Sequence, residues 1–123
     1  MPHTDCRILV IDDDEDIREA LRDVLLEEGY RVDLAENGRE ALAFMRRRGR
    51  PDLVLLDLMM PVMNGWEFLR EKSRDDDLNT VPVLVVSANP PASLPEDHVR
   101  GVMRKPVQLE QLRSAVAQVC GPA

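Results

Sequence analysis

Two hydrophobic patterns alternate along this chain. Short runs of consecutive apolar residues predict strands buried on both faces, and longer segments with apolar residues every three or four positions predict helices with one buried face. The predicted strands are residues 7–11, 31–35, 53–57, 82–87 and 101–104. The predicted helices are residues 15–28, the segment between Asn37-Gly38 and Gly49, the segment from Trp66 that fades by residues 75–77, and residues 107–120. Such alternation is typical of an α/β domain whose parallel sheet carries helices on both faces.

The segment between the last two predicted strands interrupts the alternation. Pro90, Pro91 and Pro95 lie between residues 89 and 100, and this density of proline cannot sustain a regular helix. We therefore predict a loop with at most one helical turn around Glu96 to Val99. The fourth helix of the alternating pattern is expected to be shortened or irregular.

Composition and charge narrow the class of protein. A length of 123 residues, with 44% hydrophobic and 32% charged residues, is typical of one globular domain, which we expect to span residues 1–123 without a separate output domain. The net charge of −7 argues against nucleic acid or a membrane surface as a direct partner, and the basic residues at 46–50 are expected to be a solvated helix end. Because the sequence has neither an apolar run of transmembrane length nor the apolar core of a signal peptide, we expect a cytoplasmic protein.

The two cysteines, Cys6 and Cys120, lie near opposite ends of the sequence. Disulfides are uncommon in reducing compartments, and no secretory signal is evident. We therefore expect two free, buried thiols in preference to a disulfide.

Polar residues follow the predicted strands at their carboxyl ends. Asp12 and Asp13 follow the first strand, Asp57 ends the third, Ser87 ends the fourth, and Lys105 follows the fifth. The carboxyl ends of parallel strands meet at one rim of the sheet, so these side chains are expected to lie together. Three carboxylates at close range repel one another unless a proton or cation intervenes, and an all-oxygen site of this kind suits Mg²⁺. With a lysine and a hydroxyl beside them, they predict a site that accepts a phosphoryl group.

Four motifs give the sequence a family resemblance over essentially its whole length. They are I-L-V-I-D-D-D at 8–14, L-V-L-L-D-L-M-M-P-V-M-N-G at 53–65, V-L-V-V-S-A at 83–88 and K-P at 105–106. In this order and spacing the sequence resembles the receiver domains of bacterial two-component response regulators, the CheY-like superfamily. The resemblance implies a flavodoxin-like (βα)₅ fold, doubly wound around a five-stranded parallel sheet of order 2-1-3-4-5.

The resemblance also implies a role for each acidic residue. Asp57 matches the phosphoacceptor, and Asp12 and Asp13 match the acidic pair that binds Mg²⁺ or Mn²⁺. In the family the backbone carbonyl two residues after the acceptor also binds the metal, which places Met59 in the ligand set. The phosphoryl donor is expected to be a histidine of a sensor kinase or of a histidine phosphotransfer protein, and the output to be phosphorylation-dependent binding of another protein. As in the family, we expect only self-phosphotransfer and autodephosphorylation, not turnover of an external substrate.

The remaining matched positions concern switching and the lifetime of the phosphorylated state. Lys105 matches the phosphate-binding lysine, and Ser87 matches the switch hydroxyl. Met59 and Asn89 flank the expected phosphoryl group and are predicted to tune its hydrolysis. Val102 departs from the family, which commonly has an aromatic residue three positions before the lysine. We expect the phosphorylation chemistry to be intact, and the way in which the signal is passed on at the face around Val102 to be altered.

Three other functions compete with this interpretation. A pseudo-receiver would bind partners without phosphorylation, and the complete set of Asp12, Asp13, Asp57 and Lys105 argues against it. An aspartyl-phosphate phosphohydrolase would need a second acid two residues after the nucleophile, where this chain has Met59, and a substrate-capping insert. A flavin- or nucleotide-binding domain would need a phosphate-cradling loop after the first strand, where consecutive aspartates would repel phosphate.

Overall fold

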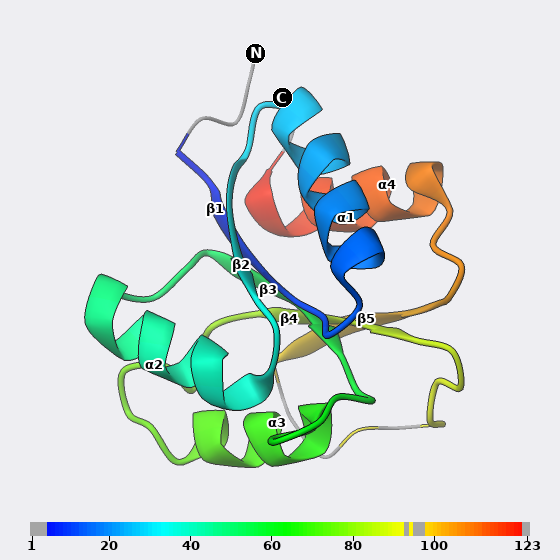
Figure 1. The fold of residues 1–123 in the computed structure, drawn as a ribbon. Helices are drawn as coiled ribbons and strands as arrows, with labels where there is room; N and C mark the ends of the chain where they lie inside the picture. Colours follow the sequence, from blue (N-terminus) through cyan, green and yellow to red (C-terminus); the bar gives the residue numbers. More distant parts are fainter. Residues whose placement is uncertain (1–4, 93, 95–97, 122–123) are drawn as a thin grey trace.

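The computed structural model describes residues 5–92, 94 and 98–121. Its centre is a parallel sheet of five strands in the order β2-β1-β3-β4-β5, as the sequence predicted (Figure 1). The strands are β1 (Arg7–Ile11), β2 (Arg31–Ala35), β3 (Leu53–Asp57), β4 (Val83–Ser87) and β5 (Val99–Arg104). The helices are α1 (Glu15–Glu27), α2 (Gly38–Arg48), α3 (Gly65–Ser73) and α4 (Leu109–Cys120). None of the described helices is long and apolar enough to cross a membrane.

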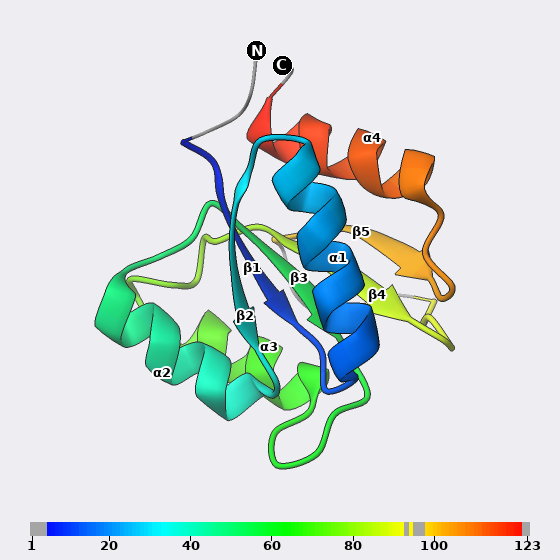
Figure 2. The ribbon, with the colours of Figure 1, turned by 45° about the horizontal axis from the view of Figure 1, so that its top comes forward.

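The register of the strands brings the polar ends of the strands together. Ile11 is paired with Leu56, so Asp12 follows β1 beside Asp57 at the end of β3. At the other side of the sheet, Ser87 is paired with Arg104, which places Lys105 next to the end of β4. Every neighbouring pair of strands is parallel, as the arrowheads of β1, β4 and β5 illustrate in Figure 2, so these residues share one rim of the sheet.

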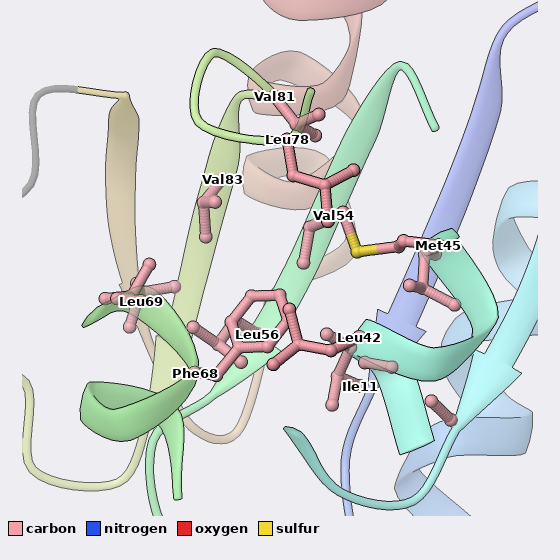
Figure 3. Close-up of a cluster of buried hydrophobic side chains, with 14 of the residues drawn as sticks. Ile11, Leu42, Met45, Val54, Leu56, Phe68, Leu69, Leu78, Val81 and Val83 are labelled. Atoms are coloured by element: carbon pink, nitrogen blue, oxygen red, sulfur yellow. The ribbon is translucent and has the colours of Figure 1, made fainter. Parts of the chain in front are cut away.

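Helices cover both faces of the sheet, with α2 and α3 on one face and α1 and α4 on the other (Figures 1 and 2). Phe68, Leu56 and Leu42 meet on the first face, in a cluster drawn from α2, α3 and the central strands (Figure 3). All residues of β3 and β4 are buried, since both faces of these strands are covered. Burial of this continuous apolar sheet is the main source of stability and holds the strand ends in place.

Side-chain caps begin three of the four helices. Asp14 accepts a hydrogen bond from the Ile17 amide at the start of α1, and Asn37 caps α2 in the same way. Asn64 and Glu67 form a reciprocal capping box at α3. Gln108, which precedes α4, makes no such side-chain hydrogen bond.

The structure shifts two predicted boundaries near the end of the chain. β5 begins at Val99, two residues earlier than predicted, and its pairing with β4 shifts register between Val83 and Leu84. The last helix begins at Leu109, two residues later than predicted, because Gln108 has an extended backbone. Hydrophobic periodicity alone assigns residues 107 and 108 to the helix.

The connection between β4 and β5 carries no helix in its described residues, 88–92, 94 and 98. This agrees with the prediction of a loop from the proline content. The single helical turn predicted around Glu96 falls largely on residues 95–97, which lie outside the described residues. Val99, at the end of that predicted turn, belongs to β5.

The prediction of free thiols is wrong. Cys6 and Cys120 form a disulfide with a Cα–Cα distance of 5.9 Å, and both sulfurs lie against the apolar cluster on the α1 and α4 face. The prediction rested on the redox compartment, which says nothing about how close the fold brings two residues. In the folded chain, Cys6, just before β1, lies next to Cys120, the last residue of α4.

Candidate functional site

Three carboxylates meet at the rim formed by the ends of β1 and β3. Asp12, Asp13 and Asp57 each present an oxygen such that these atoms lie within 4.8 Å of one another. Asp12 and Asp57 are only 1% and 4% exposed, whereas Asp13 is exposed to solvent. The cluster is therefore buried at Asp12 and Asp57 and open to solvent at Asp13.

Lys105 is the cation of this site and contacts two of the carboxylates. Its Nζ lies 3.0 Å from Asp12 Oδ2 and 3.5 Å from Asp57 Oδ2. Burial alone would lower the pKa of the Lys105 ammonium, but the hydrogen bond and charge of Asp12, together with Asp57, outweigh it and raise the pKa above its ordinary value. Lys105 is therefore charged at neutral pH and partly neutralises the acidic residues.

The raised pKa of Asp57 indicates that Lys105 does not balance the charge of the site by itself. Burial of the carboxyl group and the nearby charge of Asp12 raise the pKa of Asp57 to about 6, although Lys105 and the Met59 amide act in the opposite direction. Burial is the largest cause of the raised pKa. A carboxylate that loses its water becomes harder to ionise. A divalent cation at this position would favour the ionised form of Asp57, which is the nucleophilic one.

The donor set fits a hard divalent cation such as Mg²⁺. Mg²⁺ binds through one or two carboxylates, keeps several waters and shares its remaining positions with phosphoryl oxygens. Asp12, Asp13 and Asp57 supply carboxylate oxygens at close range, and the group found among the described residues consists of these three carboxylates. A cluster of carboxylates that Lys105 compensates only in part, with the pKa of Asp57 raised, is the electrostatic signature of such a site.

Ser87 lies on the other side of Asp57, at the end of β4. Ser87 is 1% exposed, and its hydroxyl oxygen accepts a hydrogen bond from the Asn89 amide at 3.2 Å. The Ser87 carbonyl accepts a hydrogen bond from the Lys105 amide at 2.9 Å, which joins the ends of β4 and β5. A serine hydroxyl that accepts one hydrogen bond can still donate its own proton to another group.

Met59 and Asn89 border the open side of the site. Both residues are exposed, with Met59 66% exposed. The Met59 amide donates a hydrogen bond to Asp57 Oδ1 at 3.2 Å and thereby fixes the rotamer of the carboxylate. The structure thus brings together every residue that the sequence placed at this rim.

Close packing of a glycine holds the loop after Asp57 in position. The Gly65 amide donates to the Leu58 carbonyl at 2.9 Å. A Cβ atom at Gly65 would lie 2.7 Å from the Leu58 Cα and 2.8 Å from the Asp57 carbonyl oxygen, distances that no side chain tolerates. Only glycine allows α3 to begin so close to the acidic residue.

Two contacts at the first strand end were not foreseen from the sequence. Arg18 donates through Nη1 to the Asp12 carbonyl at 2.8 Å, and the Asp14 amide donates to Asp12 Oδ1 at 2.9 Å. Together they fix the backbone and the carboxylate of Asp12. Arg18 lies one helical turn after the N-cap, and nothing in the spacing alone separates it from a solvated arginine.

Val102 lies at the face where the sequence departs from the family pattern. It pairs with Val85 across β4 and β5 and is 38% exposed. Because the described part of the β4–β5 connection has no helix, this side chain is not covered as a buried strand residue would be. A valine at this position offers a small apolar surface and no aromatic ring.

Residues 8–117 match the response regulator receiver domain family, and the chain belongs to that family. The response regulator MprA of Mycolicibacterium vanbaalenii is 44% identical over 114 residues, which cover 86% of this chain and 46% of that protein. MprA of Mycobacterium leprae is 42% identical over 118 residues, covering 89% of this chain and 49% of that protein. The chain thus spans about half the length of these relatives.

Solved structures agree with this assignment. The chemotaxis response regulator CheY4 of Vibrio cholerae has a TM-score of 0.80 at 29% identity and matches 93% of this chain and 98% of its own. A signal receiver domain of a histidine kinase from Syntrophus aciditrophicus has a TM-score of 0.82 at 30% identity, over 94% of this chain and 89% of its own. The fold is therefore the flavodoxin-like receiver fold that the motifs predicted.

Proposed function

We propose that this receiver domain accepts a phosphoryl group on Asp57 and signals by phosphorylation-dependent binding of another protein. The observation that carries the proposal is the position of the Lys105 ammonium between Asp12 and Asp57, at 3.0 and 3.5 Å, inside a cluster of three carboxylates. A cation held by two carboxylates is free to exchange one of them for a phosphoryl oxygen.

In the proposed reaction, an oxygen of the Asp57 carboxylate attacks phosphorus and forms an acyl phosphate. The bond between phosphorus and the nitrogen of a phosphohistidine breaks, and the histidine leaves with its electron pair and takes up a proton. The donor is a sensor histidine kinase or a histidine phosphotransfer protein, as family membership favours. The Met59 amide, which holds Asp57 Oδ1 at 3.2 Å, keeps the carboxylate oriented for this attack.

Mg²⁺, or Mn²⁺ in its place, would be held by Asp12, Asp13, Asp57 and the Met59 carbonyl, and when bound it would neutralise charge on the carboxylates and the incoming phosphoryl group. Lys105 would bind one phosphoryl oxygen. Ser87 would donate a hydrogen bond to another, and this contact would draw the end of β4 toward the rim.

Met59 and Asn89, at the open side of the site, are proposed to set the lifetime of the acyl phosphate by controlling access of water. We expect self-phosphotransfer and autodephosphorylation only, not turnover of an external substrate. Val102 is proposed to give this receiver a readout that does not depend on rotation of an aromatic ring.

A donor protein would meet an apolar hollow directly beside Lys105. The hollow has a volume of about 220 Å³ and lies between α1 and the segment that leads into α4. Ile17, Ala20 and Val107 are among the residues that line it. We propose that the donor docks across this hollow, in the cytoplasm, and places its phosphohistidine over Asp57.

Phosphorylation by acetyl phosphate tests the proposal without a cognate kinase. The purified chain would be incubated with acetyl phosphate, with and without Mg²⁺, and its intact mass measured. We expect the mass of one phosphoryl group to be gained only with Mg²⁺, and not in the Asp57→Asn variant. Asp76→Asn is the matched control, because Asp76 is an exposed aspartate outside the site. Equal phosphorylation of Asp57→Asn and the wild type would contradict the proposal.

A further inference from the structure

The disulfide joins the two elements that flank the site, at the end of the sheet remote from it. Cys6 immediately precedes β1, whereas Asp12 immediately follows β1. Five strand residues separate the two, so they are six residue steps apart, which corresponds to roughly 20 Å along the strand. Cys120 is the last residue of α4, and Lys105 lies in the segment that leads into this helix. β1 and the segment from Lys105 to Cys120 are therefore held together twice, by the disulfide at one end of β1 and by the Asp12–Lys105 contact at the other.

The disulfide is the covalent attachment of the last turn of α4 to β1. The buried residues of α4 are Leu112 and Val116, and no residue of its last turn is fully buried. The helix has no side-chain cap at Gln108 and no basic residue in its last turn. Arg113 is paired with Glu28 at the end of α1, but both side chains are 38% exposed, and ion pairs at such exposure contribute little.

The disulfide joins two residues that are not fully buried. Cys6 and Cys120 are both partly exposed, although they lie against the apolar cluster on this face. Reductants in a reducing compartment attack accessible disulfides. The disulfides that are found in such compartments are usually transient, and serve in catalysis or redox sensing. This step rests on the cytoplasmic location that the proposed function assigns.

We propose that Cys6–Cys120 is a site of reversible thiol–disulfide exchange, whose reduction releases the last turn of α4 and leaves the acidic site intact. The co-reactant is a dithiol. One of its thiolates attacks a cysteine sulfur, the S–S bond breaks, and the other cysteine leaves as a thiolate and takes up a proton. The second thiol of the reductant then displaces the first cysteine, so that the protein gains two thiols and the reductant becomes a disulfide.

The Asp12–Lys105 contact is the reason that reduction is expected to have a local effect. After the disulfide opens, this contact and the burial of Leu112 and Val116 still hold the start of α4 against the sheet. The residues from Ala117 to Gly121 lose their covalent attachment to β1. The redox state would thus change the mobility of the end of α4 without changing the residues around Asp57.

The test compares the oxidised and reduced chain without Mg²⁺ or phosphoryl donor, so it does not depend on whether Asp57 is phosphorylated. Protein purified without reductant is treated with a series of dithiothreitol concentrations, and new thiols are alkylated and counted by mass. We expect no alkylation before treatment and two alkylated thiols afterwards, at a rate proportional to dithiothreitol concentration. A rate that rises with dithiothreitol excludes a mechanism in which each reduction event waits for global unfolding.

Hydrogen exchange then locates the effect of reduction. Amides of Ala117 to Gly121 should exchange at least about tenfold faster after reduction, while those of β3 remain unchanged. The matched internal control is the last turn of α2, which ends in a similar glycine at Gly49 but carries no disulfide. A Cys6→Ser/Cys120→Ser double variant should show the exchange of the reduced wild type and no response to dithiothreitol.

Three results would overturn the inference. The first is two free thiols in untreated protein, and the second is a reduction rate that is independent of dithiothreitol and equal to the rate of global unfolding. The third is an increase in exchange spread evenly over the sheet, since this would make the disulfide a general stabiliser of the fold. The wild-type comparison decides the question even if the double variant does not fold.

Discussion

The ammonium of Lys105 lies 3.0 Å from Oδ2 of Asp12, a contact between residues 93 positions apart in the sequence. It joins the end of β1 to the segment after β5 across the full width of the site. Asp12 is 1% exposed, so this contact partly compensates a carboxylate that has lost nearly all of its water.

Replacement of Lys105 should therefore destabilise the metal-free protein. Lys105→Met removes the cation and leaves Asp12 and Asp57 uncompensated, and we expect the free energy of unfolding at neutral pH to fall by about 2 to 4 kcal/mol. Urea unfolding with and without Mg²⁺ measures the effect, and Mg²⁺ should restore part of the loss. Arg104→Met, at the neighbouring exposed position, serves as the control and should change stability little. Equal stabilities of the two variants would contradict the argument.

The raised pKa of Asp57 predicts a pH-dependent gain on its replacement. The pKa is about 6 in the folded protein against an ordinary value of 3.8, so protonation of Asp57 favours the folded state. This stabilisation is complete below the ordinary value and is lost as the pH rises through about 6. The side chain in Asp57→Asn stays neutral at every pH, so the variant keeps this stabilisation. Its free energy of unfolding should exceed that of the wild type by about 1 to 2 kcal/mol at neutral pH without Mg²⁺.

Urea unfolding at a series of pH values checks this expectation. The difference between Asp57→Asn and the wild type should shrink below pH 6 and vanish near the ordinary pKa of the carboxyl group. Added Mg²⁺ should also reduce the difference at neutral pH, because it would stabilise only the ionised aspartate. A difference that is constant with pH would show that burial of Asp57 carries no electrostatic cost.

The close approach at Gly65 predicts a cost for even the smallest side chain. In Gly65→Ala the new Cβ meets backbone atoms of Leu58 and Asp57, which cannot rotate away. We expect a loss of about 2 kcal/mol or more in the free energy of unfolding, and slower phosphorylation by acetyl phosphate because the loop after Asp57 must shift. Gly101→Ala is the control, since its Cβ would meet only the end of the Leu84 side chain, at 3.3 Å.

Val62 offers the opposite case, a substitution that should stabilise. Its φ of 68° is positive and it is 65% exposed, so a β-branched residue holds a left-handed backbone conformation without the benefit of burial. Asparagine tolerates this conformation better, and Val62→Asn should raise the free energy of unfolding by about 1 kcal/mol. Val102→Asn, at an exposed valine on a strand, should give no such gain in the same thermal or urea unfolding experiment.

The sequence predicted the sheet and the site well because both follow from patterns that the chain repeats. Apolar runs marked β3 and β4 because these strands are buried on both faces, and the rule that parallel strands end at one rim placed Asp12, Asp57 and Lys105 together. The family resemblance added the sheet order and the match of each residue to a position in the motif.

The features that escaped prediction depend on three-dimensional proximity or on local backbone geometry. The Cys6–Cys120 bond joins residues separated by 114 positions, and no local signal records that the two chain segments meet. Lysine is usually a surface residue, but Lys72 is fully buried, and its Nζ donates a hydrogen bond to the Asn79 carbonyl at 3.1 Å. The positive φ of Val62 was missed because valine is not the residue that such a conformation favours.

The disulfide also determines how the domain responds to mechanical force. When it is intact, tension applied at the two ends of the chain passes through the bond between Cys6 and Cys120 and leaves the sheet unloaded. In an optical trap, the oxidised protein should show no unfolding event, whereas the reduced protein should lengthen by the whole stretch between these residues. Proteases that unfold their substrates by pulling on one end would meet a closed ring under oxidising conditions and an ordinary, extensible chain after reduction.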